Sequence, residues 1–136
     1  MRITLKANER IFINGAVIRP NKRVTLELMN DATFLLEGHI IHEDQTDTPL
    51  KQLYFTAQLI LMDPGNSEKA EAVFHEMLGK MLITFSDRDI LDGLRECAHL
   101  AQEGKMFEIL KTIRSLFDKE ATIMKGVVKH STEERG

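Results

Sequence analysis

The spacing of apolar residues changes near Thr48-Pro49, and this change limits most strongly what the chain can fold into. Before it, apolar and polar residues alternate over short stretches separated by turn-forming residues, which is typical of β-strands. After it, apolar residues recur every three or four positions, as in amphipathic helices. Thr48 suits an N-cap and Pro49 the first position of a helix. The sequence therefore predicts an α+β protein with its strands first and its helices second.

The strongest strand signal lies in residues 10–19. Asn14-Gly15 favours the positive φ angles of a two-residue type I′ turn. Counting outward from that turn gives the cross-strand pairs Ile13–Ala16, Phe12–Val17, Ile11–Ile18 and Arg10–Arg19. Side chains alternate between the two faces, so the isoleucines share one face and Phe12 lies on the other. We expect the isoleucine face to pack on the helices and Phe12 to be presented between Arg10 and Arg19.

Further strands complete an antiparallel β-module over residues 1–46, with four or five short strands. Residues 2–6 read as one strand and residues 24–29 as another, which turns at Asn30-Asp31 into a return strand within residues 32–41. Exposed sheet edges invite pairing with another chain. We therefore expect a homodimer through the β-module.

About four antiparallel helices are expected over residues 47–125, packed with the strands as one compact unit rather than as independent domains. The segments that predict them are residues 49–62, stopped by Asp63-Pro64-Gly65; the stripe from Ala70 to Phe85, with Ser67 as N-cap; the stretch from Ile90 to Gly104, with Ser86 and Asp89 as a capping box; and the stretch from Met106 past Ala121. The polar tail, residues 126–136, is expected to be mobile.

Charge is distributed unevenly between the N-terminal segment and the rest of the chain. Residues 1–23 hold six basic side chains and one acid, a net +5, whereas residues 24–136 hold 12 basic and 20 acidic side chains, a net −8. Such asymmetry indicates an anionic partner for the basic end. The whole-chain charge of −3 argues against strong non-specific binding to nucleic acid.

The basic end supplies the candidate RNA-binding residues. Two arginines facing each other across a strand pair destabilise it by up to about 1 kcal/mol, and a bridging anion removes that cost. An aromatic ring beside them could stack on a base. The candidates are Arg10, Phe12, Arg19, Lys22 and Arg23. The alternative is that Glu9 or an acidic helix neutralises the arginines and that Phe12 belongs to the core.

Other candidate sites are weaker, and the sequence predicts no enzyme, metal site or cofactor. His39 and His42 are three residues apart on an expected strand, so they point to opposite faces. Cys97 and His99 are two apart on an expected helix and cannot face each other. A lone cysteine allows no internal disulfide, and no apolar run is long enough to span a membrane. We expect a cytoplasmic protein that does not contact membranes.

Five stretches in order carry a resemblance that covers roughly residues 3–125. They are "INGAVI", a basic "NKR", "VTLEL", "TP…LYF" and "MDP". In this arrangement the chain resembles the FlbT family of flagellum biosynthesis repressors. It departs from relatives at Ala7-Asn8, where they often carry Pro-Gly, and at Lys51 and Gln52, where they tend to carry arginines.

The resemblance implies post-transcriptional repression without catalysis or a cofactor. Members of this family are expected to associate with the 5′ untranslated region of flagellin mRNA and to promote its degradation, alongside a second small regulator, FlaF. The alternative is an adaptor or chaperone-like protein that grips flagellin or FlaF through a helical Met/Leu surface and affects mRNA indirectly. Methionines on the helical stripes, such as Met77 and Met81, fit a core or such a surface.

Overall fold

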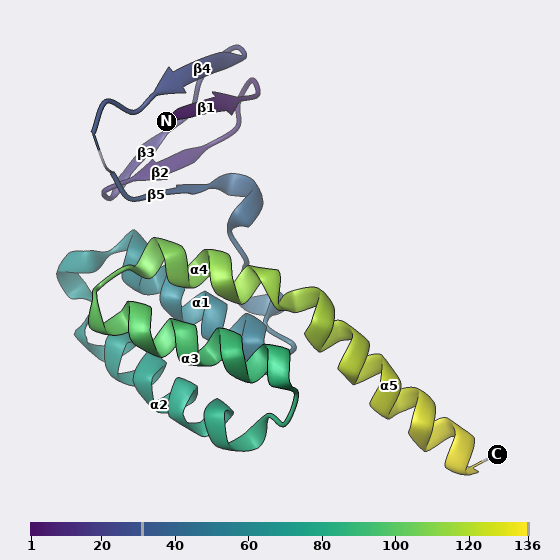
Figure 1. The fold of residues 1–136 in the computed structure, drawn as a ribbon. Coiled ribbons are helices and arrows are strands. Elements are labelled where there is room, and N and C mark those ends of the chain that lie inside the picture. The colour runs from purple at the N-terminus through teal and green to yellow at the C-terminus, as the bar shows by residue number, and fades with distance from the viewer. Residues whose placement is uncertain (31, 136) are drawn as a thin grey trace.

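Antiparallel strands come first and helices follow, so the predicted α+β class is confirmed (Figure 1). The computed structural model describes the backbone of residues 1–30 and 32–135, and side chains within this range as far as Gly126. The strands are β1 (Arg2–Leu5), β2 (Ile11–Ile13), β3 (Ala16–Ile18), β4 (Val24–Glu27) and β5 (Phe34–Leu36). The helices are α1 (Pro49–Met62), α2 (Glu68–Thr84), α3 (Arg88–Gln102), α4 (Met106–Ser115) and α5 (Phe117–Arg135), with short 3₁₀ turns η1 (Glu37–His39), η2 (Glu43–Gln45) and η3 (Pro64–Asn66).

The predicted β2–β3 hairpin is present in the predicted register. Asn14 and Gly15 have φ angles of 47° and 84°, as a type I′ turn requires. Strand β5 pairs with the other side of β2, which gives a three-stranded sheet in the order β3-β2-β5.

The second predicted hairpin is wrong. Strand β4 does not turn back onto β5 but pairs with β1, where Leu5 faces Val24. The resulting two-stranded sheet covers one face of the three-stranded sheet. Between them lies a small apolar core of Ile3, Leu5, Ile11 and Phe34. Burial of both apolar faces against each other outweighs the local preference for a hairpin.

This pairing also reverses the predicted faces of the first hairpin. Because β1 and β4 cover Ile11, the opposite face of the sheet is the one that meets the helices. That face carries Phe12 and Leu35, and both pack against the helical core. The prediction that the isoleucine face packs on the helices is therefore wrong.

The four helices α1 to α4 pack around a single core (Figure 1). Thr48 caps α1 as predicted, since its Oγ1 accepts the backbone N–H of Lys51 at 3.2 Å. Phe74 and Leu78 on α2 are 1% and 3% exposed, as predicted for the stripe, whereas Val73 of the same stripe is 46% exposed. The capping box predicted at the start of α3 is wrong by one residue: Asp87 is the N-cap and accepts the N–H of Ile90.

The helix predicted from Met106 past Ala121 is two helices. The chain bends at Leu116, and α5 then projects away from the bundle (Figure 1). At the bend Leu116 packs on α3 beside Gly93, where an added Cβ would lie 2.6 Å from the Leu116 Cδ1. The mobility expected of residues 126–136 stays a prediction, because side chains from residue 127 onward lie outside the described residues.

Candidate nucleic-acid interface

The structure brings the predicted basic residues to one end of the β-module. Arg10 directly precedes β2 and Arg19 directly follows β3, and these strands are antiparallel, so both residues lie at the same end of the sheet. Lys22 and Arg23 follow in the connection to β4. All four side chains are exposed.

Arg10 is neutralised by Glu37, at the end of the neighbouring strand β5. Its Nη2 lies 2.8 Å from the Glu37 Oε1, its Nε donates to the same oxygen at 2.9 Å, and its backbone N–H donates to Oε2 at 3.0 Å. The predicted alternative, neutralisation by Glu9 or an acidic helix, holds in part: an acid does neutralise Arg10, but it is Glu37, the first residue of η1. The N–H and guanidinium hydrogen bonds from Arg10 hold the pKa of Glu37 below its ordinary value, and the charge of Arg19 adds to this effect.

The other three cations remain available for an anionic ligand. Within the described part of the chain, Arg19, Lys22 and Arg23 have no carboxylate within 4.0 Å. Three exposed positive charges therefore lie at the same end of the β-module as the neutral Arg10–Glu37 pair. Such an arrangement can contact successive phosphates of a nucleic acid.

Phe12 is not presented on an open face between Arg10 and Arg19, and its setting agrees with the alternative that it belongs to the core. Its ring is half-buried and packs against the helical core. It also lines a cavity of about 200 Å³ whose other walls include Leu61 and Met62 of α1. The ring lies between the sheet and the helices rather than on an open surface, so it contributes to packing.

A polar junction that the sequence did not reveal joins the β-module to the helices. The buried Tyr54 of α1 donates its hydroxyl to the carbonyl of His39 at 2.5 Å, and the Arg114 Nη1 donates to that hydroxyl at 3.1 Å. Burial raises the pKa of Tyr54, while burial and the charge of Arg114 lower the pKa of His39. These partners are 15 and 60 residues apart in sequence, so no local pattern marks them.

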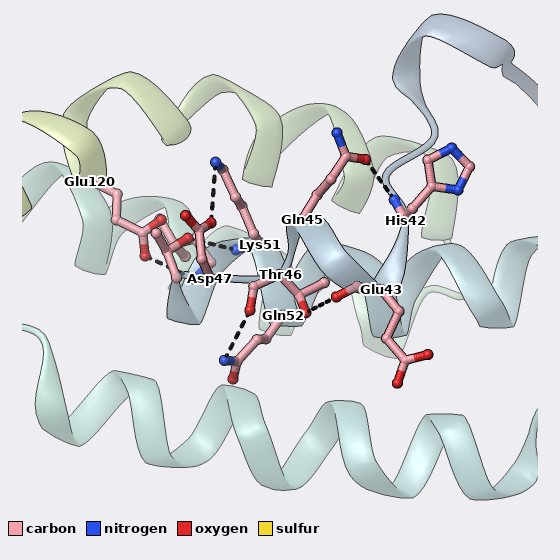
Figure 2. Close-up of polar contacts among 10 residues, drawn as sticks. His42, Glu43, Gln45, Thr46, Asp47, Lys51, Gln52 and Glu120 are labelled. Carbon is pink, nitrogen blue, oxygen red and sulfur yellow. Dashed lines mark hydrogen bonds and ion pairs between the residues drawn. The ribbon is translucent and has the colours of Figure 1, made fainter.

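The connection between η2 and α1 is fixed by hydrogen bonds, as Figure 2 shows. The backbone N–H of His42 donates to Gln45 at 2.8 Å, and the side chain of Gln52 donates to the carbonyl of Thr46. Glu120 reaches this connection from α5. Its carboxylate accepts the N–H of Leu50 at 2.9 Å and is almost fully buried.

The remaining sequence candidates form no further site. Among the residues that the structure describes, no three His, Cys, Asp or Glu side chains gather as a metal would need, and His39 and His42 are not joined by other ligands. Cys97 is buried, which raises the pKa of its thiol to about 12 and makes it a core residue. No described helix combines the length and the apolar character that crossing a membrane requires.

Comparison with known proteins identifies the family. The model of the family described as "Flagellar protein FlbT" matches residues 1–124. The chain is 51% identical over 124 residues to the "Probable flagellum biosynthesis repressor protein FlbT" of Brucella ovis, which covers 91% of this chain and 82% of the relative. The protein of the same name from Brucella anthropi is 50% identical over the same shares. No solved structure matches. The chain belongs to the FlbT family of flagellar proteins.

Proposed function

We propose that this protein represses flagellum biosynthesis after transcription, in the cytoplasm, by binding the 5′ untranslated region of flagellin mRNA and promoting its degradation. The names of its relatives support repression of flagellum biosynthesis. The observation that carries RNA contact is the group of exposed cations at one end of the β-module, Arg19, Lys22 and Arg23, which have no carboxylate partner in the described chain.

The proposed contact is to phosphates rather than to bases. Arg10 lies on the same surface, but Glu37 offsets its charge. The pair therefore contributes little to the release of counterions when RNA binds. Phe12 is left out of the contact because its ring packs on the helices. Three phosphate contacts to a single strand would give a slope of log K against log salt of about −2.

The test measures how tightly a flagellin leader RNA binds to purified protein freed of nucleic acid, at several salt concentrations. We expect Arg19→Ala to weaken binding and to reduce the slope by about 0.7, the share of one phosphate contact. Arg88→Ala, which removes an exposed arginine of α3, is the matched control and should leave the slope unchanged. Parent protein that does not bind the leader RNA, or an Arg19→Ala slope equal to the parent's, would show that the proposed contact is wrong.

A second variant separates net charge from the identity of the arginine. Arg10→Gln alone leaves Glu37 as an uncompensated negative charge, so we expect weaker RNA binding. Arg10→Gln combined with Glu37→Gln removes one charge of each sign, so binding should return toward that of the parent. If the double variant binds as weakly as Arg10→Gln, Arg10 itself touches the RNA.

The second candidate function is an adaptor or chaperone-like role toward flagellin or FlaF. The observation that favours it is apolar exposure on the helices: Leu59 of α1 and Val73 of α2 are each 46% exposed, and Met124 of α5 is 45% exposed. Calorimetric titration of purified flagellin into the protein would support this role if it gave saturable binding that Val73→Lys weakens.

A further inference from the structure

The three-stranded sheet packs on the helices at β5, and this contact decreases across β2 to β3. Leu35, Phe12 and Val17 are cross-strand neighbours on the face that meets the helices. Leu35 is 2% exposed, Phe12 is half-buried and Val17 is 58% exposed. The cavity of about 200 Å³ that Val17 and Phe12 line opens under this edge of the sheet. Of the two edge strands of the three-stranded sheet, β3 therefore lies farther from the helices than β5 does (Figure 1).

On the free side of strand β3, the backbone N–H and carbonyl that point outward belong to its central residue, Val17. In an antiparallel pair joined by a two-residue turn, the residues next to the turn exchange hydrogen bonds, and the bonding residues then alternate. Ala16 and Ile18 therefore bond to β2, and the N–H and carbonyl of Val17 face away from it. Within the described residues no other strand pairs with this side of β3.

Strand β3 lacks the usual protection of an edge. Natural sheet edges carry charged side chains, prolines or bulges that discourage pairing. The three residues of β3, Ala16–Ile18, are all exposed and uncharged. The type I′ turn bounds the edge on one side, and on the other side strand β3 ends at Ile18 and the chain leaves toward β4. The pairing window is thus residues 15–19, with Val17 at its centre.

We propose that this edge binds the same edge of a second copy of the chain, antiparallel and centred on Val17. In this register Val17 faces Val17 of the second copy, Ala16 faces Ile18, and Gly15 faces Arg19. No two like charges are opposed, and every exposed side chain of β3 gains an apolar neighbour. A second copy meets the window with a segment of the same length, bounded in the same way, and its one charged residue, Arg19, lies opposite Gly15.

A disulfide scan tests the register. Directly opposed residues that exchange hydrogen bonds have Cα atoms about 5.5 Å apart, within the range of a disulfide. Under an added oxidant such as oxidised glutathione, we expect Val17→Cys to form a covalent dimer at least ten times faster than Ile18→Cys. In the proposed register the two Ile18 Cα atoms are offset by two residues and lie about 8 Å apart, beyond a disulfide's reach. The natural Cys97 does not compete because it is fully buried.

Light scattering at tens of micromolar tests the assembly itself. We expect the parent to have a mass of about 31 kDa, twice the 15.5 kDa of the chain. Val17→Lys places two ammonium groups against each other at the centre, so it should give 15.5 kDa with an unchanged circular dichroism spectrum. Ile83→Lys, on α2 at a residue 87% exposed, is the matched control and should remain dimeric.

Three results would overturn the proposal. They are a monomeric parent at these concentrations, a Val17→Lys variant that stays dimeric, and an Ile18→Cys variant that crosslinks as fast as Val17→Cys. A parent that is monomeric alone but binds an extended peptide at this edge would assign the edge to a different partner. None of these measurements involves RNA, so they are independent of the proposed repressor function.

Discussion

Among single residues, the Arg10–Glu37 pair has the clearest electrostatic consequence. Hydrogen bonds from Arg10 lower the pKa of Glu37 below its ordinary value, so the folded chain holds this carboxylate ionised more readily than the unfolded chain does. Its contribution to stability is therefore present above the unfolded pKa and is lost as the pH falls through the lowered pKa. In an NMR titration of the Glu37 carboxyl carbon, we expect Arg10→Gln to raise its pKa toward the ordinary value.

Arg19→Gln is the comparison for this titration. Arg19 affects the pKa of Glu37 only through its charge and is the smallest of the causes, so its removal should shift the pKa less than removal of Arg10 does. The backbone N–H bond to Glu37 is present in both proteins, so a Glu37 pKa that is the same in the parent and in Arg10→Gln would contradict the guanidinium contact.

Glu120 is the residue whose role is least visible in the sequence. It lies 70 residues from Leu50, yet its buried carboxylate accepts the Leu50 N–H in the first turn of α1, where the helix dipole favours negative charge. Glu120→Ala leaves that N–H without a partner and should lower the free energy of unfolding by about 1–3 kcal/mol in urea titrations. Glu76→Ala, at an exposed position of α2, should change it by less than about 0.5 kcal/mol. Equal stabilities of the two variants would show that Glu120 does not fasten α5 to α1.

At the scale of elements, α2 is held by a few side chains of its stripe. Leu78 is 3% exposed in the helical core, so Leu78→Ala should lower the free energy of unfolding by about 2–5 kcal/mol. Ile83 lies on the same helix but is 87% exposed, so Ile83→Ala should cost much less. Thermal or urea unfolding of both variants checks this, and similar losses would mean that α2 packs through a different face.

The elements that the sequence predicted correctly are those whose signals are local. Thr48 and Pro49 start α1, Asp63-Pro64-Gly65 ends it, and Asn14-Gly15 sets the register of the hairpin, all within a few residues of the structure they determine. The pairing of β4 with β1 is not local, because it depends on which apolar faces cover each other. The wrong partner for β4 and the reversed faces of β2 are the same error, since β1 and β4 together cover Ile11.

The candidate site follows the same division. Its cations could be predicted. The excess of basic residues in the N-terminal segment is visible in the sequence, and a hairpin brings Arg10 and Arg19 to the same end of the sheet. The neutralising Glu37 could not be, since it depends on β5 pairing with β2. The Tyr54 junction also depends on tertiary contacts, which join α1 to the end of the β-module through His39.

At the scale of the whole molecule, Phe107 of α4 adds an apolar contact between the helices and the small core of the β-module, beside the contacts of Leu35 and Phe12 with the helical core. Phe107 packs against the core of the β-module, and its ring centroid lies 4.9 Å from that of Phe34. On the same helix, Ile109 and Leu110 are buried in the helical core. Phe107 therefore couples the stability of the strands to that of the helices.

Removal of this ring should weaken the attachment of the β-module to the helices. We expect Phe107→Ala to lower the protection of β-module amides such as Leu5 in native-state hydrogen exchange by about 2 kcal/mol. The Phe107 ring is only half-buried, so its loss costs less than that of a fully buried aromatic side chain. Amides of the helical core, such as Leu94, should keep most of their protection. Leu94→Ala is the matched control, and it should lower the protection of both parts because the β-module depends on the bundle that supports it. Equal losses at Leu5 and Leu94 in Phe107→Ala would mean that the chain opens only as a single cooperative unit.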